Sequence, residues 1–405
     1  MSNIEQAQVF GNSLLVKGLK LATAIMPMRE PKLTVGPGAS TRLADVIAGY
    51  GVRDVLIVTT PGIVKRGQTD GLINALKKQG VEAVIFDGVE PDPTFTVVNQ
   101  GLAVLRGAGC DGVVAFGGGS AMDAAKVIAV AAANNCKAER LAGYFKGLRK
   151  PLPLFAVPTT AGTGSEATLA SVISDDKSHA KAFVIDSRTI PLAAALDPEL
   201  MTSIPPALTA ATGMDALTHA IEAYISTIAT AETDRDALEA IRLIVDNLPK
   251  AYEDGEDLAA REAMAIASYK AGAAFTRASV GYVHAVSHQL GAFYGTPHGL
   301  GNAIVLPHVI KFSEGAARAK LARLATELGL GTSVEAEQDL AAKVAPRIRA
   351  LNKRLGIPGV ALDLQKNDIR AIARGARKEA LMNYPAPRHM SLSECEALLQ
   401  GLLAA

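Results

Sequence analysis

Thiols, excess charge and long apolar stretches are all scarce in this sequence of 405 residues. Its three cysteines, Cys110, Cys136 and Cys395, lie far apart and form no pair with metal-ligand spacing. This pattern indicates a reduced, cytoplasmic chain without a disulfide framework or a sulfur-rich zinc site. The formal net charge is only +1, with no basic or acidic block, which argues against nucleic acid or a membrane surface as the main partner.

Apolar runs are short as well, since none reaches the roughly 18 residues of a membrane-spanning helix. Residues 1–30 contain no basic region followed by an unbroken hydrophobic stretch, so they do not match a secretion signal. We interpret them as an amphipathic N-terminal extension. Of the 405 residues 49% are hydrophobic, which is enough to bury a large core, and the length favours two domains.

Strand-like and helix-like segments alternate through residues 31–204. Apolar runs at 54–60 and 81–89 are typical of strands covered on both faces, and those that begin at 111 and 152 continue into glycine-rich loops. Repeated strand–helix units of about 30 residues imply a doubly wound parallel sheet. From Pro205 and Pro206 onward the sequence is rich in alanine and has helical spacing. We therefore predict an α/β domain over 31–204 and an all-α domain over 205–405.

Two glycine-rich loops follow predicted strands of the first domain. The first reads FGGGSAMDAAK at 116–126, where glycines allow backbone N–H groups to approach an anion and the next helix adds its positive N-terminus. A tight strand–helix turn would also explain these glycines, because the motif is neither GxGxxG nor a Walker loop. The second loop, PTTAGTGSE at 158–166, is expected at the same carboxyl edge of the sheet. The pair favours a pyrophosphate site.

Four of the seven histidines fall in two short stretches beyond residue 205. Asp215 and His219 are four residues apart and share one helix face; His284 and His288 have the same spacing, and His298 follows. Polar residues that satisfy a helical core are the alternative, but the clustering favours a metal. Three imidazoles and one carboxylate suit Fe(II), Zn(II), Co(II) or Ni(II) and leave room for one oxygen ligand. Spacing leaves open whether His284 or His288 is the third ligand.

These motifs together resemble the iron-containing (group III) alcohol dehydrogenases from about residue 30 onward. The matching stretches, in the family's order, are GGGSAMDAAK, PTTAGTGSE, PPALTAATGMDALTHAIEAY and GYVHAVSHQLGAFYGTPHGLGNAIVLPHV. The resemblance implies a Rossmann-like N-terminal domain that binds a dinucleotide and an all-α C-terminal domain that binds the metal, in a dehydroquinate synthase-like fold. It also implies NAD-linked hydride transfer between nicotinamide C4 and a small primary alcohol or aldehyde at a divalent metal, Fe(II) before Zn(II), in a homodimer or higher homo-oligomer.

Site residues follow from the same resemblance. The implied metal ligands are Asp215, His219, His284 and His298. His288 is implied to lie near the nicotinamide and the substrate, where we expect a catalytic proton relay. The implied cofactor contacts are Thr60, Gly117, Gly118, Gly119, Ser120, Thr159, Thr160, Thr163 and Lys181. The expected substrate pocket comprises Ala170, Phe275, Arg277 and Met382. An ordinary surface lysine is the alternative for Lys181, and a helix-stabilising carboxylate is the alternative to a site role for Asp123.

The sequence departs from the family at three positions. Thr60 replaces an aspartate that would repel a 2′-phosphate, so NADP is not electrostatically excluded, although no nearby arginine favours it over NAD. Asp92 stands where asparagine is common. Arg277 also replaces an asparagine; it could clamp a carboxylate, sulfonate or phosphonate of the substrate, or form a salt bridge at the domain interface.

Two other functions are compatible with parts of this pattern. Metal-dependent lyases of the dehydroquinate synthase type also bind NAD and a metal, but GMDALTHAIEAY favours the dehydrogenase. A non-catalytic cofactor- or metal-binding protein is the alternative of another class. The complete sets of ligand residues and glycines argue against it.

Overall fold

A computed structural model describes residues 18, 28–176 and 181–404 of the chain. The interpretation of residues 1–30 as an N-terminal extension therefore falls almost wholly outside the described residues. Internal contacts divide the chain into two compact units. The sheet unit comprises Pro27–Ile204 with Glu256–Gly272, and the helical unit comprises Pro205–Gly255 with Ala273–Ala405.

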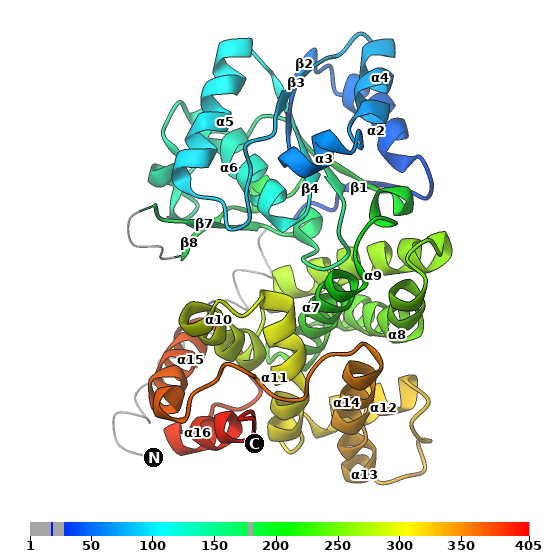
Figure 1. The fold of residues 1–405 in the computed structure, drawn as a ribbon, viewed down its shortest axis with the longest axis vertical. Helices are drawn as coiled ribbons and strands as arrows, with labels where there is room; N and C mark the ends of the chain where they lie inside the picture. The colour runs from blue at the N-terminus through cyan, green and yellow to red at the C-terminus, as the bar shows by residue number, and fades with distance from the viewer. Residues whose placement is uncertain (1–17, 19–27, 177–180, 405) are drawn as a thin grey trace. The chain divides into compact units, whose positions relative to one another are not determined.

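A six-stranded parallel sheet forms the centre of the sheet unit, as the alternating pattern predicts (Figure 1). Its strand order is β1-β9-β6-β4-β2-β3. The strands are β1 (Lys32–Val35), β2 (Asp54–Val58), β3 (Glu82–Phe86), β4 (Gly112–Gly117), β6 (Leu154–Pro158) and β9 (Ala193–Leu196). From β2 the chain moves outward to β3 and then returns to the other side of β2 with β4. The order therefore reverses between β2 and β4.

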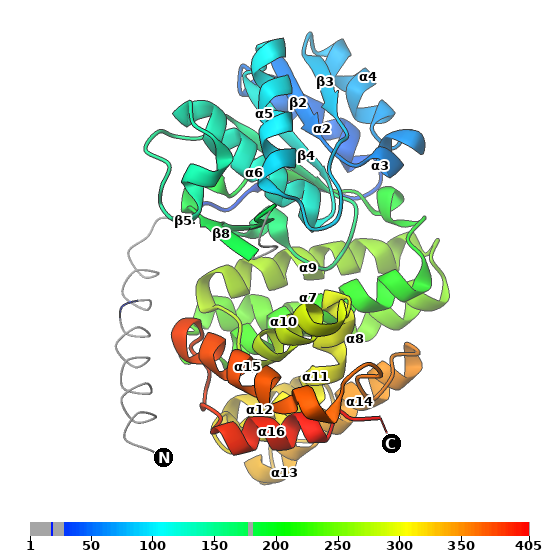
Figure 2. The same cartoon turned by 60° about the vertical axis from the view of Figure 1, so that its left-hand side comes forward.

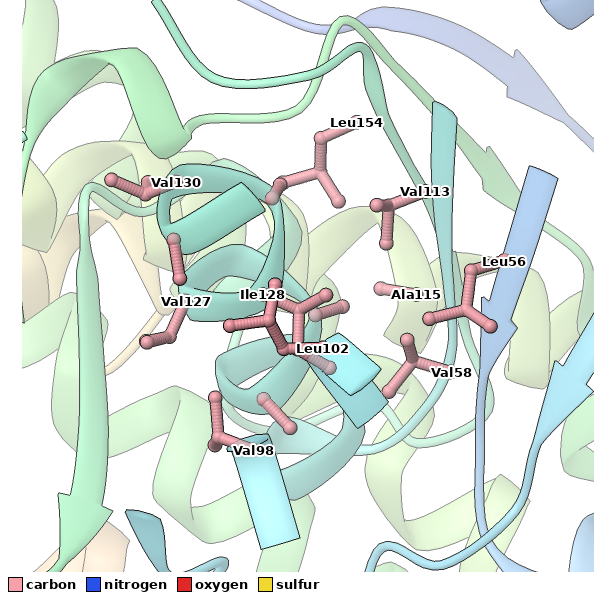
Figure 3. Packing of buried hydrophobic residues seen from close by; sticks show 14 of the residues in the cluster. Leu56, Val58, Val98, Leu102, Val113, Ala115, Val127, Ile128, Val130 and Leu154 are labelled. Carbon is pink, nitrogen blue, oxygen red and sulfur yellow. The ribbon is translucent and has the colours of Figure 1, made fainter. Parts of the chain in front are cut away.

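Helices cover both faces of this sheet, which explains the unbroken apolar strands. Side chains alternate between faces, so Leu56 and Val58 pack with one helix layer while Val55 and Ile57 pack with the other. Figure 3 shows the first layer, where Leu102 and Ile128 meet the strands. The helices of the sheet unit are α2 (Ala39–Gly49), α3 (Pro61–Lys65), α4 (Asp70–Lys78), α5 (Phe95–Ala108) and α6 (Gly119–Asn134). Its 3₁₀ turns are Ala138–Leu141, Ser165–Ala167, Ser187–Thr189 and Pro198–Met201.

A second, three-stranded sheet was not predicted from the sequence. It is ordered β5-β8-β7, with β5 (Gly143–Tyr144), β7 (Ala170–Ser174) and β8 (Lys181–Ile185). β7 and β8 are antiparallel, and Phe183 of β8 is 45% exposed. β5 has only two residues and β7 reads ASVIS, so neither has the continuous apolar run that reveals β2 or β4. The four apolar residues of β8, AFVI, were missed.

The helical unit begins where proline is favoured, since Pro206 is at the start of α7 (Pro206–Ile225). Helix α11 packs against both α7 and α10 (Figure 2). Between residues 205 and 404 the structure contains helices and connecting segments, with no strand. The other helices are α8 (Ala231–Glu253), α9 (Leu258–Ala278), α10 (Tyr282–Tyr294), α11 (His298–Ser313), α12 (Arg318–Glu327), α13 (Glu337–Ala342), α14 (Val344–Arg354), η5 (Lys366–Asp368), α15 (Ile369–Asn383) and α16 (Leu392–Gln400).

The first part of α9 groups with the sheet unit because of a very close backbone contact. A Cβ atom at Gly164 would lie 2.4 Å from the Ser268 carbonyl oxygen, and one at Gly272 would lie 2.4 Å from the Gly164 carbonyl oxygen. The Gly164 N–H also donates to Ser268 Oγ at 3.1 Å. Glycine is required at both positions for this approach. In the described part of the chain, no helix has the length and apolarity that crossing a membrane demands.

Candidate functional site

The reversal of strand order between β2 and β4 marks a ligand site on general grounds. In open parallel sheets, ligands bind beyond the carboxyl ends of the strands where the order reverses. Thr60 lies two residues after the end of β2, and the glycine loop begins at Gly117, the last residue of β4. The structure therefore places Thr60 and the first glycine loop on either side of this reversal point.

The two glycine-rich loops pack directly against each other, as their expected places at one sheet edge imply. A Cβ atom at Gly118 would lie 3.2 Å from Thr160 Oγ1, and one at Gly119 would lie 2.8 Å from Thr163 Cγ2. The Thr159 N–H donates to the Gly117 carbonyl oxygen at 3.1 Å. The threonine side chains occupy the space that side chains at 118 and 119 would need.

This close packing predicts the effect of Gly119→Ala. The new methyl group would overpack against Thr163 Cγ2, so we expect the free energy of unfolding to fall by about 1–3 kcal/mol in urea titrations. Thr163→Ser removes that methyl group and keeps the hydroxyl that accepts from the Ser165 N–H at 3.3 Å. The double variant should therefore regain most of the lost stability. Equal instability of the single and double variants would contradict this account of the contact.

The amino end of α6 offers backbone donors to an anion at the glycine loop. Its N-cap residue is Gly118, which has no side chain to satisfy the first N–H groups of the helix. Those N–H groups and the 16-residue helix dipole suit a phosphate. Ser120 lies in this first turn and adds a hydroxyl group.

Behind the glycine loop, Asp123 and Lys126 tie α6 to the second loop and to β7. Lys126 Nζ donates to Ser165 Oγ at 3.0 Å, to Thr168 Oγ1 at 2.8 Å, and to the carbonyl oxygens of Thr168 and Ala170 at 2.9 and 3.0 Å. Asp123 accepts from Ser165 Oγ at 3.0 Å and from the Val172 N–H at 2.9 Å. These contacts give Asp123 a tertiary role beyond its own helix. Sequence analysis missed Lys126, although its spacing of three from Asp123 places both on one helix face.

Burial shifts the pKa values of the ionisable groups in this network. Desolvation lowers the pKa of Lys126 to about 8, against the opposing charges of Asp123 and Glu166. Desolvation also raises the pKa of Asp123, and it raises that of Glu166 to about 7. Glu166 is only 2% exposed, so its ionised form is strongly disfavoured in the folded chain.

The raised pKa of Glu166 predicts a pH effect on stability. Between its ordinary pKa of 4.5 and about 7, the folded chain holds this proton more tightly than the unfolded chain, so the free energy of unfolding falls as pH rises. Glu166→Gln removes this contribution. We therefore expect the variant to gain stability relative to the wild type from pH 5 to pH 7, by at most about 1.4 kcal/mol per pH unit. Urea titrations across this range measure the difference, and parallel pH curves would refute the assignment.

Lys181 and Asp92 were considered separately in the sequence, and the structure brings them together. Lys181 Nζ lies 2.5 Å from Asp92 Oδ1 and donates to Ser174 Oγ at 3.1 Å. Asp92 has a positive φ of 56°, a conformation that aspartate tolerates better than most residues. Both side chains are exposed. Lys181 therefore takes part in an ion pair on the protein surface, beside β7.

In the helical unit, three helices bring one carboxylate and three imidazoles to a single point. Asp215 and His219 come from α7, His284 from α10 and His298 from the first residue of α11. One ligand atom from each residue lies within 4.8 Å of all the others. His219 Nε2 is 3.9 Å from Asp215 Oδ1, and His298 Nε2 is 3.4 Å from it. This is the same set that the family resemblance implies.

The donors of this cluster fit a divalent metal such as Fe(II) or Zn(II). Asp215, His219 and His284 are buried, whereas His298 is 44% exposed, so one side remains open to solvent. Burial and the neighbouring histidines hold the pKa of His284 well below its usual range. A neutral imidazole is the form that binds a metal.

Two buried residues next to the cluster were missed in the sequence. Glu222 Oε2 lies 2.6 Å from His284 Nδ1. Asn302 Nδ2 lies 2.7 Å from Asp215 Oδ1 and 3.1 Å from His298 Nε2. Helical spacing places both on the same helix face as a ligand, because Glu222 follows His219 by three residues and Asn302 follows His298 by four, but spacing alone does not mark them as part of the site.

The hydrogen-bonding partner of His288 lies outside the cluster of four residues. Its Nδ1 lies 2.6 Å from Glu379 Oε1, and this oxygen accepts from the Tyr384 hydroxyl at 2.7 Å. Its ring stacks on that of His298, with centroids 5.3 Å apart and an interplanar angle of 22°. No sequence pattern indicates Glu379, which lies 91 residues beyond His288.

The residues expected to line the substrate pocket have different surroundings. The Phe275 ring stacks on the His219 imidazole with centroids 4.2 Å apart. Arg277 forms an ion pair with Glu232, and both residues belong to the helical unit. Met382 is 59% exposed on α15. Ala170 lies in the sheet unit at the start of β7.

Comparison with known proteins finds the same family over nearly the whole chain. Residues 30–198 match the family described as iron-containing alcohol dehydrogenase, and residues 209–403 match the C-terminal part of the Fe-containing alcohol dehydrogenase family. The 1,3-propanediol dehydrogenase of Klebsiella pneumoniae is 44% identical, covering 81% of this chain and 86% of the relative. The NAD-dependent methanol dehydrogenase of Bacillus methanolicus is 36% identical, covering 92% and 98%. Sulfoacetaldehyde reductase from Bifidobacterium kashiwanohense, solved in complex with NAD⁺, has a TM-score of 0.85 and 31% identity, covering 93% of this chain and 99% of that one.

Proposed function

This chain belongs to the iron-containing alcohol dehydrogenase family, and on that basis we propose that it interconverts a small primary alcohol and its aldehyde with a nicotinamide dinucleotide. The observation that carries the proposal is the convergence of Asp215, His219, His284 and His298 in the helical unit. A lyase of the dehydroquinate synthase type and a non-catalytic binding protein are the alternatives, and the family match favours the oxidoreductase.

Each residue of the cluster has a defined part in this proposal. Asp215, His219, His284 and His298 would hold the ion through one atom each, and His298 is the ligand open to solvent. A bound Fe(II) supplies Lewis acidity toward an alcohol or carbonyl oxygen, and Zn(II) is the second choice. The Phe275 ring against His219 gives this side of the cluster an apolar wall, which suits a small aliphatic group.

For the coenzyme we propose NAD, held by the residues of the glycine loops. The backbone N–H groups at Gly118, Gly119 and Ser120 would bind the pyrophosphate, with Thr159, Thr160 and Thr163 beside them. The nicotinamide ring supplies the hydride chemistry. Two relatives support NAD, since one is described as NAD-dependent and another was solved with NAD⁺. Thr60, which lies just beyond β2, has no carboxylate that would repel the 2′-phosphate of NADP, so NADP is the second choice.

We assign His288 the transfer of a proton toward solvent. Its side chain is 34% exposed, and Glu379 holds its Nδ1 so that Nε2 is the atom left to exchange a proton. Imidazole suits this role because its ordinary pKa lies close to neutrality.

The substrate we propose is neutral, because the charge of Arg277 already has a partner. An arginine selects a carboxylate or sulfonate through charge-assisted hydrogen bonds, and Glu232 engages one of its guanidinium nitrogens in this chain. An aldehyde with an anionic group is the second candidate. It takes its support from the similarity to sulfoacetaldehyde reductase.

A panel of aldehydes tests this proposal directly. Protein reconstituted with Fe(II) is supplied with NADH or NADPH and with propanal, lactaldehyde or anionic aldehydes, and coenzyme oxidation is followed. We expect neutral aldehydes with NADH to give a kcat/KM at least about tenfold higher than anionic ones. The reverse preference would assign Arg277 to substrate binding. Absence of any NADH oxidation would refute the dehydrogenase proposal.

We further propose that the enzyme acts in the cytoplasm as a homodimer or a higher homo-oligomer. All three cysteines are free thiols, which is compatible with a reducing compartment. Light scattering of the purified protein measures the number of subunits, and a mass of one chain would exclude an oligomer.

A further inference from the structure

Glu222 is a buried carboxylate that the proposed function does not use. It lies on α7 with two of the clustered residues, three positions after His219 and seven after Asp215, so all three share one face of the helix. Its exposed fraction is only 3%, and burial acts to raise its pKa while hydrogen bonds from α10 act to lower it. A buried carboxyl group carries a large desolvation cost unless its surroundings compensate for it.

Two backbone N–H donors and one imidazole nitrogen from the start of α10 converge on this carboxylate. Glu222 Oε2 accepts from the Gly281 N–H at 2.9 Å and faces His284 Nδ1 at 2.6 Å. Glu222 Oε1 accepts from the Val283 N–H at 2.7 Å. The Gly281 and Val283 groups belong to the first turn of α10, where backbone N–H groups have no partner within the helix. One carboxylate therefore caps α10 and contacts a side chain that α10 presents to the cluster.

The absence of a side chain at residue 281 permits this arrangement. A Cβ atom at Gly281 would lie 2.8 Å from Glu222 Oε1, which is too close for a non-bonded contact. The position of the carboxylate thus depends on two features: α7, which carries Glu222, and the glycine that precedes α10, which leaves room for the carboxylate.

Contacts on the opposite edge of the His284 ring agree with this orientation. His284 Nε2 points toward the cluster and lies 3.4 Å from Asn302 Nδ2. This NH₂ group has two hydrogens, and it lies closer to Asp215 Oδ1 and His298 Nε2. Because it cannot accept, a free lone pair on His284 Nε2 suits this neighbour better than a proton does. A proton on Nδ1 toward Glu222 leaves Nε2 as that acceptor, since neutral imidazole carries one proton.

We propose that Glu222 is a positioning residue that fixes the Nδ1–H tautomer of His284 and so presents the Nε2 lone pair to the metal. The inference rests on the proposed metal site, and it adds a residue that acts through a ligand without touching the ion. Carboxylates that orient metal-binding histidines in other proteins affect metal affinity by about 10–100-fold.

Replacement of Glu222 by glutamine separates this role from simple packing. Gln has nearly the same shape, but its amide has only one oxygen to face three donors. Whichever way the amide turns, an NH₂ group meets an N–H donor. If it meets His284 Nδ1, it favours the Nε2–H tautomer, whose proton points at the metal position.

The first test compares Co(II) affinity of the wild type, Glu222→Gln and Glu166→Gln by competition with a chelator. Glu166 is the matched control, because it is equally buried and has a similarly raised pKa but lies in the sheet unit. We expect a 10–100-fold loss of Co(II) affinity in Glu222→Gln and an unchanged affinity in Glu166→Gln. Equal affinity of Glu222→Gln and wild type, or equal losses in both variants, would overturn the inference.

The second test needs no variant and covers the case in which Glu222→Gln does not fold. Selective ¹⁵N labelling of the seven histidines reports the tautomer of each ring in the metal-free wild type. We expect Nδ1–H for His284, and an Nε2–H signal would overturn the inference. If the wild type binds no Co(II), the proposed metal site itself is wrong and the inference fails with it. If only the Glu222 results fail, the metal site stands.

Discussion

Replacement of His298 by alanine is expected to abolish both metal binding and turnover. His298 contributes one of four ligand atoms and begins α11, where its side chain is 44% exposed. Its removal leaves little cavity, so the fold should persist while the ion loses a ligand. Lewis-acid stabilisation by a metal is worth several kcal/mol, so we expect kcat/KM to fall by at least about 10³-fold. Metal content by elemental analysis and the rate of NADH oxidation are measured on the same preparation.

His308 provides a matched control for this substitution. It lies on the same helix, ten residues further along, and does not belong to the cluster. His308→Ala should retain the full metal content and most of the activity. A His298→Ala protein that remains fully active without metal would refute the ligand assignment, and metal loss in both variants would point to a general effect on α11.

Replacement of Lys126 by methionine should cause the largest loss of stability. Lys126 is 1% exposed, and its ammonium group donates to two hydroxyl groups and two carbonyl oxygens. Methionine fills the space but satisfies none of these acceptors, and it removes the buried positive charge that favours the ionised form of Asp123. Breaking a buried pair by removing one partner typically costs about 3–5 kcal/mol, so we expect a drop of that size in the free energy of unfolding.

Lys137→Met is the control, because Lys137 is an exposed lysine just beyond the end of α6. Exposed substitutions of this kind usually change stability by less than about 0.5 kcal/mol. Urea titrations at pH 7 compare the two variants with the wild type. If they lose equal amounts, the network around Lys126 does not stabilise the sheet unit as described.

The parts of the fold that could be predicted are those with a strong sequence period. β2 and β4 are apolar at almost every position because helices cover both of their faces, and the resulting runs at 54–60 and 111–117 are unmistakable. The short β5 and the serine-containing β7 have no such run. The grouping of Glu256–Gly272 with the sheet unit also escaped prediction, because it depends on the contact between Gly164 and Gly272, more than 100 residues apart in sequence.

The same distinction applies to the site. Spacing in the sequence placed Asp215 with His219, but it did not distinguish His284 from His288, because these two histidines are four residues apart and share one face of α10. The family resemblance favoured His284, and in the structure it is His284 that joins the cluster while His288 faces Glu379. Residues that act through a ligand, such as Glu222, lie on predictable helix faces, but nothing in a single sequence distinguishes them from ordinary buried polar groups.

The presence of Asp215, His219 and Glu222 on one helix has a consequence for how this protein can change. Successive residues of an α-helix are turned by about 100°, so the deletion of one residue between 216 and 221 would rotate one part of this trio away from the other. Point substitutions elsewhere on α7 do not change the relative directions of these three side chains. We therefore expect the length of this segment to be far less tolerant of alteration than its composition, a constraint that laboratory evolution of this chain by insertion and deletion would reveal.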